Sequence, residues 1–282
     1  MNCKKIICSL SLYAGVITTG YCDNKDSLGL PGDNLDLYGV MELFKNSKSP
    51  EDFEKALNQE DNKVNNLDLN EDNETDYIKV IDHTGDNAHA LVLQVVVNET
   101  ESQDVAVIEI EKENNETARI QVIGDEDLYG KNYIVEPAEE VEAGATPPPQ
   151  PLISTPSNPP VVVNVWAWPS VRYVYGPKYV VWTSPWKWKH YPGWWKPWKP
   201  FHWHAYHGRV RPYHLYHHRV HAHRVVRAHT VYYNHRVVSK TVYQRRAMVK
   251  PHPHGRQMQK QHAPRGKRAK ANHPKQHNGP RK

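Results

Sequence analysis

The C-terminal part of this 282-residue chain contains no acidic residue. All 31 Asp and Glu lie at or before Glu142, and residues 1–160 hold only 11 Lys and Arg, so their net charge is −20. Residues 161–282 hold 25 Lys and Arg and cannot form internal ion pairs with carboxylates. They also contain little Leu, Ile or Phe, so an ordinary self-contained core is difficult for them to form. This asymmetry, hidden in a total charge of +5, predicts two physically distinct parts.

Cysteines and long apolar runs are also scarce. Lys4 and Lys5 precede the apolar run Ile6–Tyr21, whose 16 residues fall short of the roughly 20 needed to cross a bilayer. This order predicts a secretory signal peptide over residues 1–22, and the lack of a longer run excludes a multi-spanning membrane protein. The exported chain would keep only Cys22 and form no intramolecular disulfide. Lipidation of Cys22 is the alternative to a soluble exported protein in the periplasm or at the cell surface.

In the acidic segment 23–137, the spacing of apolar residues predicts an α+β domain. Apolar residues at helical spacing predict a helix within 35–48, and Ser49 followed by Pro50 predicts the cap and first turn of a second helix. After Asp76 the period changes to two in five segments, which predicts strands: Tyr77–Asp82, His89–Val97, Asp104–Glu111, Arg119–Ile123 and Asn132–Glu136. The short connections favour antiparallel pairing, so we expect two helices on one face of a small antiparallel sheet of four or five strands.

The remaining chain divides by composition into a Pro-rich linker (138–160), a Trp-rich basic segment (161–203), an Arg/His-rich segment (204–250) and a basic tail (251–282). The Trp-rich segment has strand-like pieces, including 171–175, with a hairpin expected at Gly176–Pro177. The tail has almost no apolar residue and is expected to be disordered. A partly disordered basic half on a linker is the main expectation. Folding of the two halves together through contacts between acidic and basic residues is the alternative.

The loop Asp68–Asp76 has the spacing of a calcium-binding loop. Oxygen-bearing side chains stand at its positions 1, 3, 5 and 9, and position 7 can offer its backbone carbonyl. The predicted metal ligands are Asp68, Asn70, Asp72, Glu74 and Asp76. The pattern is similar to the calcium hairpins of integrin-type propeller repeats. The alternative is a polar turn whose Asp and Asn side chains satisfy backbone donors without a metal.

The Trp-rich segment alternates aromatic rings with cations, a pattern typical of binding to single-stranded nucleic acid, anionic saccharides or an anionic membrane surface. The predicted polyanion-binding residues are Trp186, Trp188, Trp194, Trp195 and Trp198 with Lys187, Lys189, Lys196 and Lys199. Export favours lipopolysaccharide and peptidoglycan over extracellular DNA. The alternative is that the tryptophans pack into a small module and the lysines keep it soluble.

Histidine is concentrated in the basic half, which holds 16 of the 18. The pairs His202/His204, His221/His223 and His252/His254 have spacings that can bind Zn, Ni or Cu weakly. A His-rich transition-metal-handling protein is therefore the second functional hypothesis. Control of charge by protonation near pH 6 is another use of these residues.

Three segments carry a family resemblance: Asn66–Asn70, Tyr77–Val80 and Ile123–Gly130. Together with Val163–Pro169 they resemble uncharacterised exported proteins of Bacteroidota-type bacteria, over roughly residues 33–200. The resemblance implies a location in the bacterial envelope and implies no activity. The chain shows no nucleophile with a base and no cofactor loop, which favours a non-enzymatic protein. The resulting prediction is an exported envelope protein with a calcium-type loop in an acidic domain and a basic aromatic region that binds a polyanion.

Overall fold

The computed structural model describes residues 27–138 and 162–248. The predicted signal peptide, nearly all of the predicted linker and the predicted tail (251–282) lie outside these residues. No helix in the two described ranges combines the length and the apolar character needed to cross a membrane.

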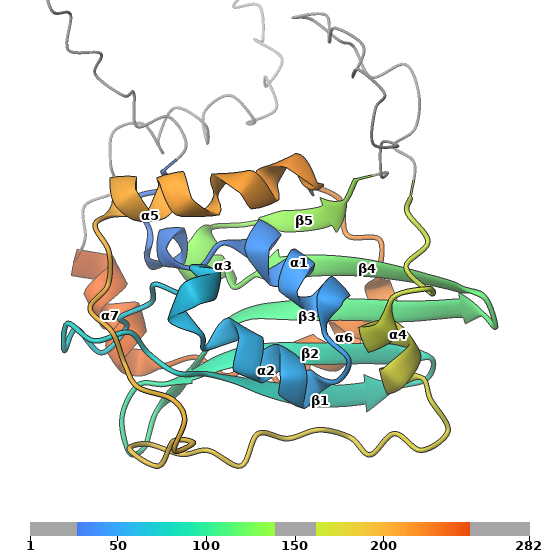
Figure 1. Ribbon diagram of the computed structural model, residues 1–282, viewed down its shortest axis with the longest axis horizontal. Helices are drawn as coiled ribbons and strands as arrows, with labels where there is room; N and C mark the ends of the chain where they lie inside the picture. Colours follow the sequence, from blue (N-terminus) through green and yellow to red (C-terminus); the bar gives the residue numbers. More distant parts are fainter. Residues whose placement is uncertain (1–26, 139–161, 249–282) are drawn as a thin grey trace, which may run out of the picture.

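The centre of the fold is a six-stranded antiparallel sheet whose strands are neighbours in chain order (Figure 1). The strands are β1 Ile78–Gly85, β2 Ala88–Val96, β3 Ser102–Asn114, β4 Thr117–Gly124, β5 Ile134–Pro137 and β6 His217–Val220. The five predicted strand segments are confirmed as β1 to β5, because their alternating side chains face two layers. The predicted strand number was too small, since β6 comes from the Arg/His-rich segment and pairs with β5, with Ile134 opposite Val220.

Helices and 3₁₀ turns come from both halves of the chain. The helices are α1 Leu37–Asn46, α2 Pro50–Leu57, α3 Glu126–Tyr129, α4 Pro169–Val174, α5 Trp203–Val210, α6 Val226–Tyr233 and α7 Lys240–Met248. The 3₁₀ turns are η1 Pro31–Asn34, η2 Glu60–Asn62 and η3 Arg211–Leu215. The two predicted N-terminal helices are confirmed: Ser49 Oγ accepts from Asp52 N at 3.1 Å, and Pro50 opens α2.

The first face of the sheet is apolar and lies under α1, α2 and α4 (Figure 1). Phe44 of α1 and Phe53 of α2 are fully buried and pack edge to face, with ring centroids 5.3 Å apart. Val171 and Val174 of α4 join the same core, as do the partly buried Trp166 and Trp182. The basic half therefore supplies part of the hydrophobic core that the acidic half could not complete alone.

The second face of the sheet carries both carboxylates and a smaller apolar cluster, and it lies under α6, which contacts β1, β2 and β3. Alternation along β3 places Glu109 and Glu111 on the opposite face from Ile108 and Ile110. Cations and histidines of the basic half meet these and other carboxylates. The contacts between the halves include Arg224–Glu136, Arg227–Glu111, His229–Glu109, Arg236–Asp125, Arg236–Asp127, Arg246–Asp127, Arg245–Glu71, His214–Asp36 and His217–Glu42.

The prediction of strands in the Trp-rich segment was wrong. Residues 171–175, expected as a strand, lie mostly in α4, because Pro169 presets the backbone for a first helical turn. Gly176 and Pro177 follow α4 and form no hairpin between strands. Within 162–203 the β contacts are isolated bridges, Ile81 to Thr183 and Lys187 to His190, since the many prolines lack the N–H that a ladder needs.

Candidate binding cleft

An extended segment of the basic half, residues 179–201, runs along the outer edge of the sheet, and we call it the strap. It starts beside β1, where Asp82 N donates to Trp182 O at 2.9 Å and Ser184 N donates to Val80 O at 3.1 Å. It ends beside the acidic loop, where Thr75 N and Thr75 Oγ1 both donate to Trp198 O, at 2.8 and 2.9 Å. The strap therefore joins β1 to the loop Asp68–Asp76 through backbone hydrogen bonds.

Glu54 of α2 anchors the first part of the strap. Its carboxylate is buried and accepts hydrogen bonds from Tyr77 Oη at 2.8 Å, Val80 N at 2.8 Å and Ser184 Oγ at 2.9 Å. Trp182 Nε1 donates to it at 3.4 Å. Burial raises the pKa of Glu54, and these four donors act against that shift. One carboxylate thus ties a helix, a strand and the strap together.

The acidic loop is held by hydrogen bonds of its own. Asp68 accepts from Asp72 N at 3.1 Å and from Asn73 N at 3.0 Å, and Asp72 accepts from Glu74 N at 2.8 Å. Asn73 has a φ of 66°, in the left-handed region that Asn tolerates better than most residues. This arrangement has the bonding of the polar turn that the sequence left as the alternative to a calcium loop.

Asp76 closes the acidic loop from the buried side. Its Oδ2 accepts from Leu69 N at 2.5 Å, and its side chain is 6% exposed. Burial, together with the nearby charges of Asp68 and Asp72, raises the pKa of Asp76 to about 7, although the hydrogen bond from Leu69 N acts in the opposite direction. Its carboxylate is therefore charged only in part at neutral pH.

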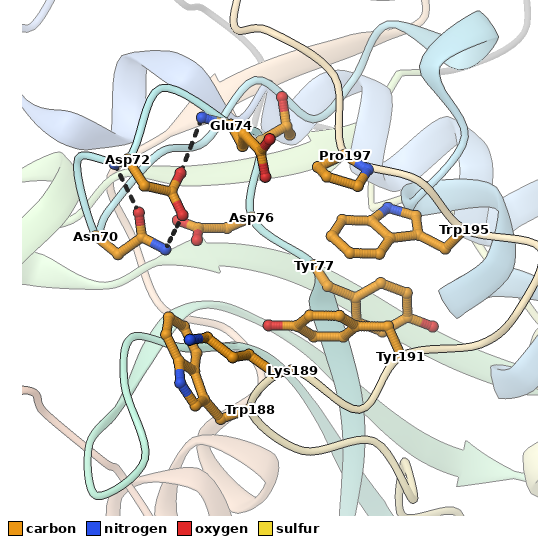
Figure 2. A pocket seen from close by; sticks show the side chains of 11 residues that line it. Asn70, Asp72, Glu74, Asp76, Tyr77, Trp188, Lys189, Tyr191, Trp195 and Pro197 are labelled. Carbon is orange, nitrogen blue, oxygen red and sulfur yellow. Dashed lines mark hydrogen bonds between the residues drawn. The ribbon is translucent and has the colours of Figure 1, made fainter.

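An open cleft of about 310 Å³ lies between the acidic loop and the strap. Figure 2 shows the acidic and amide side chains on one side, the rings of Tyr77, Tyr191 and Trp195 on the other, and Trp188 and Lys189 at a third edge. The lining residues are Asn70, Asp72, Glu74, Thr75, Asp76, Tyr77, Trp188, Lys189, Tyr191, Trp195 and Pro197. Its size is at the lower end of the range of small-molecule sites, about 300–1,000 Å³.

The aromatic wall of the cleft is a packed group of three rings. Tyr191 lies 4.6 Å from Trp195 between centroids, and Tyr77 lies 5.6 Å from Tyr191 and 5.2 Å from Trp195. Because Tyr77 also donates to Glu54, the wall is fixed to α2 as well as to the strap. Packing of these rings against one another restricts their orientations, which lowers the entropic cost of binding.

A tight turn presents the other aromatic side chain. Lys187 N donates to His190 O at 3.2 Å and His190 N donates to Lys187 O at 2.9 Å, so Trp188 and Lys189 stand at its tip. Lys189 has a φ of 57°, and its Nζ lies 5.7 Å from the Trp188 ring centroid. The tip thus offers one flat ring and one cation to the cleft.

Two site predictions made separately from the sequence meet in this cleft. Of the predicted metal ligands, four line it, and Asp68 does not. Of the predicted polyanion-binding residues, Trp188, Trp195 and Lys189 line it. The residues outside the lining are Trp186, Trp194, Trp198, Lys187, Lys196 and Lys199. Tyr77, Thr75, Tyr191 and Pro197 were missed, although the aromatic richness around Tyr191 was a signal for one of them.

The charge of the cleft limits its ligands. Asp72, Glu74 and Asp76 face one cation, Lys189, so a phosphate or other anion would be repelled. Carboxylate and amide oxygens accept hydrogen bonds from hydroxyl or ammonium groups, and aromatic faces contact flat apolar surfaces. This combination fits a sugar ring, particularly an uncharged or amino sugar.

The described residues contain one group of three His, Cys, Asp or Glu side chains whose ligand atoms all lie within 4.8 Å of one another, namely Glu109, His223 and His229. The loop carboxylates do not form such a group, and calcium there stays a prediction. Comparison with protein families, with curated proteins and with solved structures finds no match.

Proposed function

We propose that this is an exported, non-enzymatic envelope protein that binds a glycan strand in the cleft between the acidic loop and the strap. The observation that carries the proposal is the convergence of four aromatic residues with three carboxylates in one open cleft. Peptidoglycan, whose strands contain amino sugars, fits this chemistry best among the polymers considered. Lipopolysaccharide phosphates and DNA would place anions against Asp72 and Glu74.

The lysines of the strap extend the proposed site beyond the cleft. Lys187, Lys196 and Lys199 are exposed and stand close in sequence to the lining residues. They would attract carboxylates carried by the same polymer at positions that project out of the cleft. A long polymer can therefore satisfy both the acidic cleft and its basic surroundings, whereas a small anion cannot.

Several cations of 162–248 form ion pairs inside the fold. Fewer cations are therefore left to bind a polyanion than the sequence alone suggests. Arg224, Arg227, Arg236 and Arg246 each contact a carboxylate. Ten of the 25 cations of the basic half lie in residues 249–282, outside the described part. Any binding of nucleic acid or lipopolysaccharide would therefore rest on those ten, on the strap lysines and on the remaining cations of 162–248, which are Arg172, Lys178, Arg209, Arg211, Arg219 and Lys240.

Binding of the full chain to purified peptidoglycan, lipopolysaccharide and double-stranded DNA tests the proposal. Trp188→Ala should weaken binding to peptidoglycan by about 1–3 kcal/mol, the usual range for one stacking ring. Trp194→Ala is the matched control, because Trp194 is 46% exposed and lies outside the cleft. Asp72→Asn should also weaken binding to peptidoglycan.

Equal losses in the Trp188 and Trp194 variants would contradict the cleft as the binding site. Binding to DNA alone, with affinity falling steeply as salt rises, would replace the proposal by a purely electrostatic one. Release of new reducing ends from the glycan would make the protein an enzyme. The second candidate function is transition-metal handling. It is favoured by the separate group Glu109, His223 and His229, on the second face of the sheet under α6.

A further inference from the structure

A carboxylate lies fully buried beneath α6, in the middle of the sheet. Glu109 of β3 is 0% exposed and stands between Ala90 of β2 and Gln121 of β4 in the strand register. Its Oε1 lies 2.8 Å from His229 Nδ1 of α6. Its Oε2 is buried without a hydrogen-bond partner. A buried carboxylate oxygen with no donor calls for a specific explanation.

A second buried atom without a partner belongs to a neighbouring histidine, His223. His223 Nδ1 is buried and has no hydrogen-bond partner, and the His223 ring lies 4.3 Å from the His229 ring between centroids. One ligand atom from each of Glu109, His223 and His229 lies within 4.8 Å of the other two. Two of the three side chains in this group therefore each carry a buried atom without a hydrogen-bond partner.

His223 is held in place by Gln121 on both sides along the chain. Gln121 Nε2 donates to Ala222 O at 2.9 Å, and Gln121 Oε1 accepts from Arg224 N at 2.9 Å. The residue between these two anchors is His223. A side-chain amide that binds both neighbours fixes the backbone of His223 against β4, so its ring position does not depend on its own hydrogen bonds.

His229 is held by Glu111 at the start of α6. The Glu111 carboxylate accepts from Arg227 N and from Ala228 N, the latter at 3.1 Å, and so binds free N–H groups of the first helical turn. Glu111 lies two residues from Glu109 on the same face of β3. The strand that supplies one carboxylate to the group thus also orients the helix that supplies an imidazole.

We propose that Glu109, His223 and His229 form a binding site for a transition-metal ion of the Zn²⁺ type. Two imidazoles and one carboxylate are a common ligand set for zinc, and imidazole suits Cu²⁺ and Ni²⁺ as well. Ligand distances of about 2.0–2.2 Å place tetrahedral ligands about 3.4 Å apart, so the three atoms need to move by only about 1 Å. The fourth position would take water, because three protein ligands leave a tetrahedral site open.

The residues around Glu109, His223 and His229 favour a bound cation at this group. An ion bound by this group would give a partner to the buried Glu109 carboxylate, which has one oxygen without a hydrogen-bond donor. Solvent reaches the site past His229, whose side chain is 37% exposed. Gln121 and Glu111 are the partners that orient the ligand-bearing segments, as outer-sphere residues do in metal sites.

Zinc binding to the full chain tests the proposal, with thermal unfolding and Co²⁺ absorption spectra as the two measurements. Zn²⁺ should raise the unfolding midpoint of the parent over that in chelator, and Co²⁺ should give the intense bands of a tetrahedral site. His223→Ala should weaken Zn²⁺ binding at least tenfold, since even outer-sphere changes cost about 10–100-fold. Because His223 Nδ1 has no partner, this variant should fold like the parent without metal.

His204→Ala is the matched control, because His204 is an exposed histidine of α5 away from this group. It should keep the parent response, because any weak metal contact that His204 makes lies outside this group. A second variant, Glu109→Gln, keeps an acceptor for His229 and should also lose the tetrahedral Co²⁺ spectrum. An equal zinc response in the parent and His223→Ala, or an equal loss in His204→Ala, would overturn the proposal.

Discussion

Arg236 Nε lies 2.7 Å from the buried Asp125 Oδ2, which joins the basic and acidic halves across 111 residues of sequence. The same guanidinium reaches Asp127 Oδ2 at 2.9 Å through Nη2, and Tyr232 Oη stands 3.5 Å from Asp125. The two carboxylates raise the pKa of Arg236 and keep it charged. Asp125 is nearly inaccessible to water, so its charge is compensated by the other half of the chain.

Arg236→Ala is therefore expected to destabilise the fold by about 3–5 kcal/mol, because it leaves a buried carboxylate without its cation. Denaturant unfolding at pH 7 measures the change. Arg172→Ala is the control, since Arg172 is an exposed residue of α4 and its loss should change the free energy of unfolding by less than about 0.5 kcal/mol. Equal effects of the two substitutions would show that the Arg236 contact contributes nothing.

The halves should stay associated after the chain is cut between them. A protease site placed at Pro147–Pro149, in the undescribed stretch 139–161, would separate residues 27–138 from 162–248 without touching either. We expect the nicked halves to co-elute in gel filtration even in about 1 M salt, where charge interactions are screened beyond about 3 Å. Val165, Val171 and Val174 bury apolar surface that salt does not weaken.

The control for that experiment is the same cut in the Arg236→Ala chain, which should dissociate more readily. Separation of the parent halves at low salt would show that they are independent domains joined only by the linker. That result would also restore the sequence-based expectation of a basic half that is not folded onto the acidic one.

The elements that the sequence predicts are those whose signal is local. Ser49 and Pro50 specify the start of α2 within a few residues, and alternation specifies β1 to β5. The elements it misses depend on distant partners: β6 pairs with β5, and α6 carries Arg227 and His229, whose carboxylate partners lie on β3. The basic composition of β6 and α6 favours disorder unless their contacts with the acidic half are taken into account.

The candidate sites follow the same division. The residues of the acidic loop and of the Trp-rich segment were each picked out by spacing, but their meeting depends on the bond from Thr75 to Trp198, 123 residues apart. Glu109 offered a weaker signal: a carboxylate among the apolar residues of a central strand needs a partner from elsewhere in the chain. The sequence therefore predicts that Glu109 has a tertiary contact, but it does not identify the partner residue.

The buried His217 of β6 should make the contact between the acidic and basic halves sensitive to acid. Burial lowers the pKa of His217 to about 4, although Glu42 Oε2, 3.1 Å from Nε2, acts in the opposite direction. The unfolded chain, with a pKa near 6.5, binds a proton that the folded chain refuses, so stability present above pH 6.5 is lost as the pH falls toward 4. His217→Gln keeps a donor for Glu42 and does not titrate.

Denaturant unfolding at pH 7 and pH 5 compares the two chains. Between these values the parent should lose about 2 kcal/mol more stability than His217→Gln, at 1.36 kcal/mol for each pH unit of the shift. The other titrating groups are shared by both chains and cancel in the comparison. Parallel pH profiles would show that His217 titrates as it does in the unfolded chain.

Calcium remains a sequence-based prediction for the acidic loop, and the structure gives it a physical reason to be tested. Asp68 and Asp72 repel the charge on Asp76, and a bound cation would relieve that repulsion. With a dissociation constant of about 10 μM, calcium at about 1 mM should stabilise the fold by about 2.7 kcal/mol. Thermal unfolding in calcium and in chelator measures the effect, which Asp72→Ala should abolish.

Asp86→Ala is the matched control for this experiment, because Asp86 is an exposed acid in the turn between β1 and β2. It should keep the full calcium response while removing the same charge. Asp72→Ala should leave the zinc response at Glu109 intact, since that group lies on the second face of the sheet under α6. Coincident melting curves with and without calcium would identify the loop as a polar turn, in which Asp68 and Asp72 accept backbone N–H groups and no ion is needed.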